Sequence, residues 1–229
     1  GLADLARRFA PDQPIAIIPN GVDAARFSPA DARSDGDRLS LLFVGRVVHQ
    51  KGLDVLFEAL AGLSPALRDR IGLTIVGDGP ARPELEAQAA RPGLSGQVTF
   101  RGWLGRDELP AAYRAADAFV FPSRDEGMPN VVLEAMAAGL PVVATRIAGN
   151  RDLVVEEETG LMLDADDTPA LAAAITRLAE DPALRRRLGE GGRRRVVEHF
   201  SWRAVAAAYR DLSLAGRAAP GRVPSTQAE

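Results

Sequence analysis

The chain of 229 residues has no cysteine, and only 5% of its residues are aromatic. Without thiols it has no cysteine nucleophile, thiolate metal ligand or redox switch, although this does not define its compartment. A net charge of −3 gives no basic excess of the kind that nucleic-acid-binding domains carry. No apolar run approaches the roughly 18 residues of a transmembrane helix, and residues 1–10 lack the apolar core of a signal peptide.

Lysine is almost absent as well. Lys51 is the only lysine among 28 basic residues, and it lies in a glycine-flanked loop. An ammonium group is a compact charge with three donors, which suits a phosphate where a planar guanidinium does not fit. Retention of one lysine by chance is the other interpretation, and this observation alone leaves both open.

Short apolar runs alternate with amphipathic segments along the chain. The strand-like runs are Ile15–Ile18, Leu39–Val44, Leu73–Val76, Val98–Phe100, Ala118–Phe121, Val142–Ala144 and Gly160–Leu163. The helix-like segments are 52–62, 81–91, 106–115, 130–138, 168–180, 182–198 and 201–214. Apolar runs without polar alternation are typical of strands covered on both faces. The pattern predicts an α/β fold with a Rossmann-like, doubly wound parallel sheet.

The C-terminal helices carry their own start signals. Thr168 before Pro169 predicts a helix N-cap, and Asp181 before Pro182 repeats the signal. In the last helix we expect Trp202 and Tyr209 to lie on or near the packing face. The arginine clusters 185–187 and 193–195 are interpreted as a solvated helix face, with an anionic membrane surface as the alternative.

Ligands of a doubly wound sheet bind beyond the carboxyl ends of its strands, so the loops there are the candidate sites. After Val44, Gly45 allows a turn, and Arg46 and Lys51 place two cations near a helix N-terminus. This loop is expected to hold a diphosphate, unless it is a turn with two solvated charges. The later pair Gly77 and Gly79 lacks the third glycine of a dinucleotide fingerprint and predicts a tight turn.

Two further loops offer exposed backbone and carboxylates. Beside Gly102 and Leu104, Trp103 either packs over the sheet edge or contacts a base. Glu126 lies in a loop, and Glu134 lies one turn into the following helix. Two carboxylates beside a diphosphate would repel it unless they accept hydroxyl groups. A ligand with a sugar, a diphosphate and a ribose meets both requirements.

In this order and spacing, these segments resemble the retaining group 1 glycosyltransferases of the GT-B fold. The resemblance rests on GRVVHQKG with Arg46 and Lys51, on EGMPNVVLE, whose Glu126 and Glu134 match the E-x7-E motif, and on AMAAGLPVVAT. Segments 18–23 and 159–161 also match, and the resemblance covers about residues 15–212. The segment 148–152 departs from the usual Gly-Gly and Pro-Glu pattern.

The resemblance implies a role for each position. Arg46, Lys51 and Glu126 would be the catalytic residues: the two cations would neutralise the departing diphosphate, and Glu126 would hold the donor sugar. Glu134 would bind the ribose. The nucleotide-sugar site would further contain Gly45, Gly102, Trp103, Leu104, Gly127, Met128, Pro129, Asn130 and Val131. No cofactor or metal is expected, and a nucleotide diphosphate sugar, with UDP or GDP as its nucleotide, would be the co-substrate.

The resemblance also implies an organisation for the chain. Residues 1–14 would be a linker helix from a missing N-terminal acceptor domain, and residues 15–200 the nucleotide-sugar-binding domain. Residues 201–215 would form the terminal crossover helix, and 216–229 a disordered tail. The piece alone would bind donor without transferring it, and its exposed docking face could self-associate. A cytoplasmic hexosyltransferase is expected, with contact to the inner face of the membrane as an open option. A nucleotide-sugar-binding regulatory module and a GT-B epimerase are the alternatives.

Overall fold

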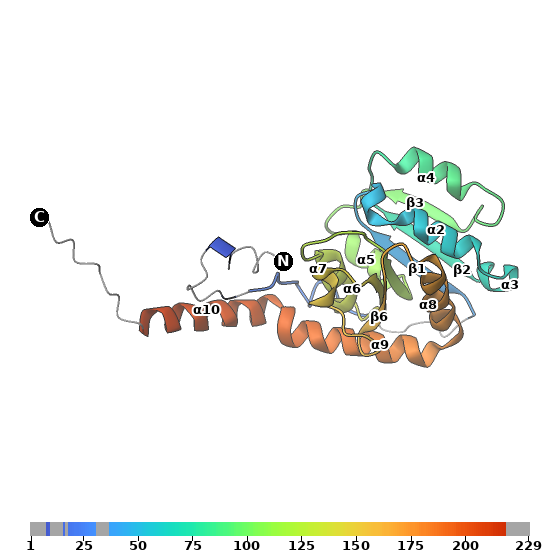
Figure 1. Cartoon of the computed structure of the whole chain (residues 1–229). Coiled ribbons are helices and arrows are strands. Elements are labelled where there is room, and N and C mark those ends of the chain that lie inside the picture. Colours follow the sequence, from blue (N-terminus) through green and yellow to red (C-terminus); the bar gives the residue numbers. More distant parts are fainter. Residues whose placement is uncertain (1–7, 10–15, 17, 31–36, 219–229) are drawn as a thin grey trace, which may run out of the picture.

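The computed structural model describes residues 8–9, 16, 18–30 and 37–218 (Figure 1). The predicted linker helix and disordered tail therefore lie largely outside the described residues. The predicted strand at 15–18 is described only at Ala16 and Ile18, and neither of these residues is in a strand.

Six strands form one parallel sheet in the order β3-β2-β1-β4-β5-β6. They are β1 Leu39–Val44, β2 Ile71–Val76, β3 Val98–Gly102, β4 Ala118–Phe121, β5 Val142–Thr145 and β6 Gly160–Leu163. The predicted α/β, doubly wound sheet is confirmed. β2 begins two residues earlier than expected, because Ile71 and Gly72 pair with Leu39 and Ser40 of β1.

Helices join these strands. β2 and β3 are added on one side of β1, and after β3 the chain crosses back so that β4, β5 and β6 are added on its other side. They are η1 His49–Lys51, α2 Leu53–Ala61, α3 Pro65–Arg68, α4 Arg82–Ala89, α5 Leu109–Arg114, α6 Asn130–Ala137, α7 Ala148–Arg151, α8 Thr168–Glu180, α9 Pro182–Arg195, η2 Val196–Phe200 and α10 Trp202–Ala218. Right-handed crossovers place α2 and α4 on one face and α5 and α6 on the other. α8 then packs beside α2, and α9 beside α6.

Five of the twelve phenylalanine, tyrosine and tryptophan residues form one packed row. Phe27 meets Tyr113 edge-on, and Tyr113, Phe119, Phe121 and Phe43 follow with successive ring centroids 5.8 to 6.0 Å apart. Tyr113, Phe119 and Phe43 are fully buried. This row fixes β4 and α5 against each other, so the residues at their ends have firm supports.

The N-cap of α8 differs from the prediction. Asp167 is the N-cap, and its carboxylate accepts a hydrogen bond from the N–H of Ala170 at 2.9 Å, so Thr168 lies inside the helix. Asp181 caps α9 as expected, through the N–H of Leu184 at 2.8 Å. A carboxylate at either position complements the positive end of the helix dipole.

The arginines of α9 do not form a simple solvated face. Arg185 is buried and donates to the carbonyl of Leu178 at 2.5 Å, and Arg193 donates to the carbonyl of Ala137 at 2.6 Å. Arg195 donates to carbonyl groups just after α7. Carbonyl groups at helix ends have no intrahelical partner, which explains this use of guanidinium groups. The solvated-face interpretation is wrong for these three, because their guanidinium groups bind backbone carbonyls of the same domain.

Helix α10 projects from the body of the domain (Figure 1). It continues to Ala218, three residues beyond the expected limit at 215. The expectation that Trp202 and Tyr209 lie on a packing face is wrong for most of their surface, since they are 60% and 58% exposed. One face of the Trp202 ring does pack on Gly21, where an added Cβ would lie 2.4 Å from ring atom Cε3. No helix among the described residues is long and apolar enough to cross a membrane.

Candidate functional site

The loops after β1 and β4 meet at the point where the strand order reverses. The backbone N–H of Arg124 donates to the carbonyl of Gln50 at 2.8 Å. The side chain of Gln50 donates to the carbonyl of Asp125 at 2.9 Å. Because β1 and β4 are parallel neighbours, the loops that follow them leave the sheet at the same edge, where a doubly wound sheet binds its ligand. The expectation that these loops share one edge of the sheet is confirmed.

Lys51 and Glu126 form an ion pair at this junction. The Lys51 ammonium contacts Glu126 Oε1, which also accepts a hydrogen bond from the Ser123 hydroxyl at 2.7 Å. The two side chains are 16% and 13% exposed, and Lys51 Nζ lies 5.4 Å from the centre of the Phe121 ring. The structure therefore brings these two predicted residues together, in a partly desolvated place where charges interact strongly.

Gly52 makes this approach possible. Its φ of 69° is in the left-handed region, and an added Cβ would lie 2.1 Å from the carbonyl oxygen of Pro122. A side chain would thus be opposed both by backbone strain and by a clash with the β4 loop. The short η1 turn ends at Lys51, and Gly52 is its C-cap. The conformation of Gly52 therefore helps to set the position of the Lys51 side chain.

Arg124, which sequence analysis did not select, ties the two loops together. Its guanidinium lies 2.7 Å from Asp54 of α2 and 2.8 Å from Asp166, and it also donates to the carbonyl of His49. Partial burial raises the pKa of Asp54, but the hydrogen bond and charge of Arg124, together with backbone hydrogen bonds at the start of α2, outweigh this and lower it. Only the spatial arrangement shows this role, because Arg124 and Asp54 are far apart in the chain.

Arg46 is not part of the contact between Lys51 and Glu126. Its side chain is exposed, and it has no ion-pair partner within the described part of the chain. Gly45, the residue before it, lies against Gly77, because an added Cβ on Gly77 would lie 2.0 Å from the Gly45 carbonyl oxygen. An added Cβ on Gly79 would lie 2.3 Å from the carbonyl oxygen of Val47. The Gly77 and Gly79 pair thus allows the β1 and β2 loops to touch.

Glu134 is partly buried one turn into α6, beside Tyr113 of α5. Its Oε2 accepts a hydrogen bond from the Tyr113 hydroxyl at 2.8 Å. Burial raises the pKa of Glu134, against the smaller lowering effects of that hydrogen bond and of the Arg26 charge. Burial and the Glu134 charge also raise the pKa of Tyr113 well above its ordinary value, so its hydroxyl stays protonated.

The segment between the two glutamates leads into the start of α6. Helix α6 has no side-chain cap at its N-terminus, which follows Pro129. N–H groups of an uncapped first turn can bind an anion or a hydroxyl group. Beside them, the Asn20 side chain donates to Asn130 Oδ1 at 3.0 Å and to the Met128 carbonyl at 3.4 Å.

Gly127 and Gly149 have different reasons for being glycine. A Cβ on Gly127 would meet nothing within 4 Å, so its surroundings are open. A Cβ on Gly149 would lie 2.4 Å from the Gly127 carbonyl oxygen, so α7 packs directly against this loop. Although segment 148–152 departs from the family pattern, it still supports the loop that carries Glu126.

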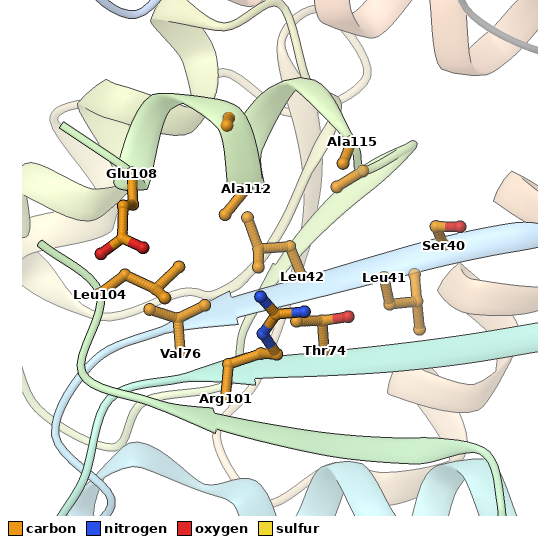
Figure 2. Close-up of a pocket in the computed structure, with 12 residues that line it drawn as sticks. Ser40, Leu41, Leu42, Thr74, Val76, Arg101, Leu104, Glu108, Ala112 and Ala115 are labelled. Atoms are coloured by element: carbon orange, nitrogen blue, oxygen red, sulfur yellow. The ribbon is translucent and has the colours of Figure 1, made fainter.

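The remaining predicted residues lie at the carboxyl end of β3 and just after it. Gly102 has a φ of 67°, and Trp103 is 72% exposed, so the interpretation that Trp103 packs over the sheet edge is wrong. Leu104 lines a cavity of about 400 Å³ between α5 and the first three strands (Figure 2). Arg101 and Glu108 also line it, whereas Lys51, Glu126 and Glu134 do not. Among the described residues, no group of histidine, aspartate or glutamate side chains could hold a metal ion.

The fold and this edge of the sheet define a Rossmann-like ligand-binding domain. The family description "Glycosyl transferases group 1" matches residues 25–195, so the chain belongs to that family. The chain is 36% identical to a GDP-mannose-dependent α-(1-6)-phosphatidylinositol monomannoside mannosyltransferase of Mycolicibacterium smegmatis over 230 residues. That match covers 93% of this chain and 59% of the relative.

Two solved structures have the same fold. Sucrose-phosphate synthase of Thermosynechococcus elongatus matches 95% of this chain with a TM-score of 0.81 and 33% identity, and the match covers 56% of that structure. The C-terminal domain of a group 1 glycosyl transferase (LpcC) of Francisella tularensis matches 80% of this chain with a TM-score of 0.71 and 27% identity. All of that second structure is covered. The chain thus spans a little over half of the first relative and of the first structure.

Proposed function

We propose that this chain is the donor-binding part of a retaining glycosyltransferase that transfers a hexose from a nucleotide diphosphate sugar. The observation that carries the proposal is the convergence of Lys51, Glu126 and the uncapped start of α6. Glu134 lies one turn further along the same helix and is partly buried. Cations, carboxylates and free N–H groups are thus arranged along one edge, as a ligand with a diphosphate and two polyols requires.

Each group has a chemical task in this proposal. The Lys51 ammonium and the exposed Arg46 guanidinium stabilise the charge that grows on the diphosphate as its bond to the sugar breaks. Glu126 accepts hydroxyl groups of the sugar and holds the anomeric carbon in position. Glu134 accepts ribose hydroxyls. The backbone near Gly102, Trp103 and Leu104 contacts the base. No metal or other cofactor has a part in this scheme.

The rest of the reaction is assigned to a second domain. The relative and the solved structure described above extend well beyond the matched region. The matched Francisella structure is a C-terminal domain by its own description. We therefore assign this chain to the C-terminal half of a GT-B enzyme, with the acceptor site on an N-terminal domain. A glycan, a lipid or a small molecule would then be the acceptor.

Two other functions would use the same donor site. A regulatory module would bind the nucleotide sugar without transferring it, and a GT-B epimerase would act on the sugar itself. The contact between Lys51 and Glu126 at the site favours a transferase over a binding module, because a binding module has no need for groups that assist departure of the diphosphate.

Calorimetric titration of this chain with UDP, GDP, ADP and CDP tests the proposal. We expect saturable binding of at least one nucleotide, and weaker binding in Arg46→Ala and Lys51→Ala. Glu134→Ala should weaken binding of the corresponding nucleoside as well. Arg91→Ala is the matched control, since Arg91 is an exposed arginine at the end of α4. Unchanged affinities in all three site variants would show that the site is assigned wrongly.

A further inference from the structure

Tyr113 is a fully buried residue whose hydroxyl points at a proposed ligand-binding carboxylate. Its ring is held by Phe27 and Phe119, with centroids 5.5 and 5.8 Å away. Its hydroxyl lies 2.8 Å from Glu134 Oε2 and 3.3 Å from the carbonyl oxygen of Val131. A phenylalanine would fill the same apolar space, so packing alone gives no reason for the hydroxyl.

The hydroxyl and the carboxylate meet from different elements. Tyr113 lies in α5 and Glu134 in α6. A tyrosine has one hydroxyl hydrogen, and an ionised carboxylate is the stronger of the two acceptors within its reach. The hydrogen bond to Oε2 therefore fixes the rotation of the carboxylate. It leaves Oε1 and the second lone pair of Oε2 for other donors.

We propose that Tyr113 is a positioning residue that orients the Glu134 carboxylate toward the vicinal hydroxyls of the donor's ribose. This inference rests on the function proposed above. A carboxylate that is already oriented loses little rotational freedom when two ribose hydroxyls donate to it. Without the tyrosine hydroxyl, the partly buried Glu134 carboxylate would lose the hydrogen bond that orients it, and loss of a hydrogen-bond partner to a partly buried charge is costly.

The test compares ribonucleotides with nucleotides that lack the ribose hydroxyls. Calorimetry would measure the affinities of wild type, Tyr113→Phe and Glu134→Ala for UDP and GDP and for their 2′,3′-dideoxy forms. Wild type should prefer the ribonucleotide, and Glu134→Ala should lose that preference. Tyr113→Phe should bind the ribonucleotide about tenfold more weakly, with little change for the dideoxy form, because one hydrogen bond to a charged group is lost.

Phe27→Leu is the matched structural control. It removes the edge-on ring contact to Tyr113 but leaves the hydroxyl in place. It should lower the melting temperature without changing the ratio of ribonucleotide to dideoxynucleotide affinity. A lower melting temperature in Tyr113→Phe with an unchanged ratio would show that Tyr113 is structural only, and would overturn the inference.

The outcomes separate the inference from the function on which it rests. If wild type shows no preference for the ribonucleotide, or if Glu134→Ala keeps it, the role of Glu134 is wrong and the inference falls with it. If wild type and Glu134→Ala behave as expected while Tyr113→Phe matches wild type, only the inference fails.

Discussion

The pairing of Lys51 with Glu126 can be measured as a coupling free energy in the ligand-free chain. Lys51→Met removes the ammonium but keeps an unbranched apolar side chain over the Phe121 ring. Glu126→Gln removes the charge but keeps an oxygen that can accept from the Ser123 hydroxyl. The double variant removes both charges. Comparison of the four proteins isolates the interaction between the two side chains.

The expected magnitude follows from the burial of the pair. Loss of one partner of a fully buried ion pair costs about 3–5 kcal/mol, because the remaining charge has no partner. Lys51 and Glu126 keep 16% and 13% of their side-chain surface exposed, and Ser123 remains beside the carboxylate. We therefore expect each single variant to lose about 2 kcal/mol of unfolding free energy. The double variant should lose little more than either single one.

Urea-induced unfolding of the four proteins would measure these free energies. For a chain of this size, a loss of about 2 kcal/mol lowers the melting temperature by about 4–8 °C. The control is the same cycle on the more exposed pair of Arg82 and Glu86, which lie 2.7 Å apart within α4, with Arg82→Met and Glu86→Gln. There we expect a coupling of about 0.3–0.5 kcal/mol. If the effects at Lys51 and Glu126 add to within about 0.5 kcal/mol, the reasoning is refuted.

Two further variants test other parts of the candidate site. Glu134→Gln should match wild type in stability near pH 4 and be more stable at pH 8. Burial raises the pKa of Glu134, so the stability that its neutral form contributes to wild type is lost as the pH rises through that pKa. Equal pH profiles of the unfolding free energy for wild type and Glu134→Gln would contradict this. Gly52→Ala should destabilise the chain by more than about 1–2 kcal/mol, the cost of a left-handed backbone, since its Cβ also meets Pro122. A crystal structure of that variant with an unmoved η1 turn would disprove the expected clash.

Much of the fold could be predicted because each buried parallel strand is a short continuous run of apolar residues. Runs such as Leu39–Val44 are apolar at nearly every position, and the structure buries all but one of those residues. The proximity of Lys51 to Glu126 could also be predicted, because both follow strands whose carboxyl ends face the same edge. In each case the signal lies within a few consecutive residues, and the topology of a parallel sheet then determines which loops lie at the same edge.

The contacts that could not be predicted are those whose partners are distant in the sequence. Arg193 reads as one charge in a basic run, yet it binds the carbonyl groups of Ala24, Phe27 and Ala137. Tyr113 reads as an aromatic residue on a helix, and only the packing of α5 beside α6 shows which carboxylate it meets. The local sequence pattern predicts whether such a residue is buried, but it does not predict which residue it contacts.

The contact between Lys51 and Glu126 in the ligand-free chain leads to a prediction about Glu126→Gln. This variant should weaken the binding of a nucleotide sugar but not the binding of the nucleotide alone. The ammonium has three donors, so it can keep Glu126 and still bind a phosphate. Glu126→Gln removes the negative charge beside the diphosphate, so UDP or GDP should bind as well as or better than to wild type. A nucleotide sugar also donates its hydroxyls to Glu126, and it should lose about 1.5–3 kcal/mol with the charged acceptor. The advantage of the nucleotide sugar over its nucleotide should therefore shrink about tenfold or more in calorimetry. An equal loss for both ligands would mean that Glu126 supports the loop and does not bind the sugar.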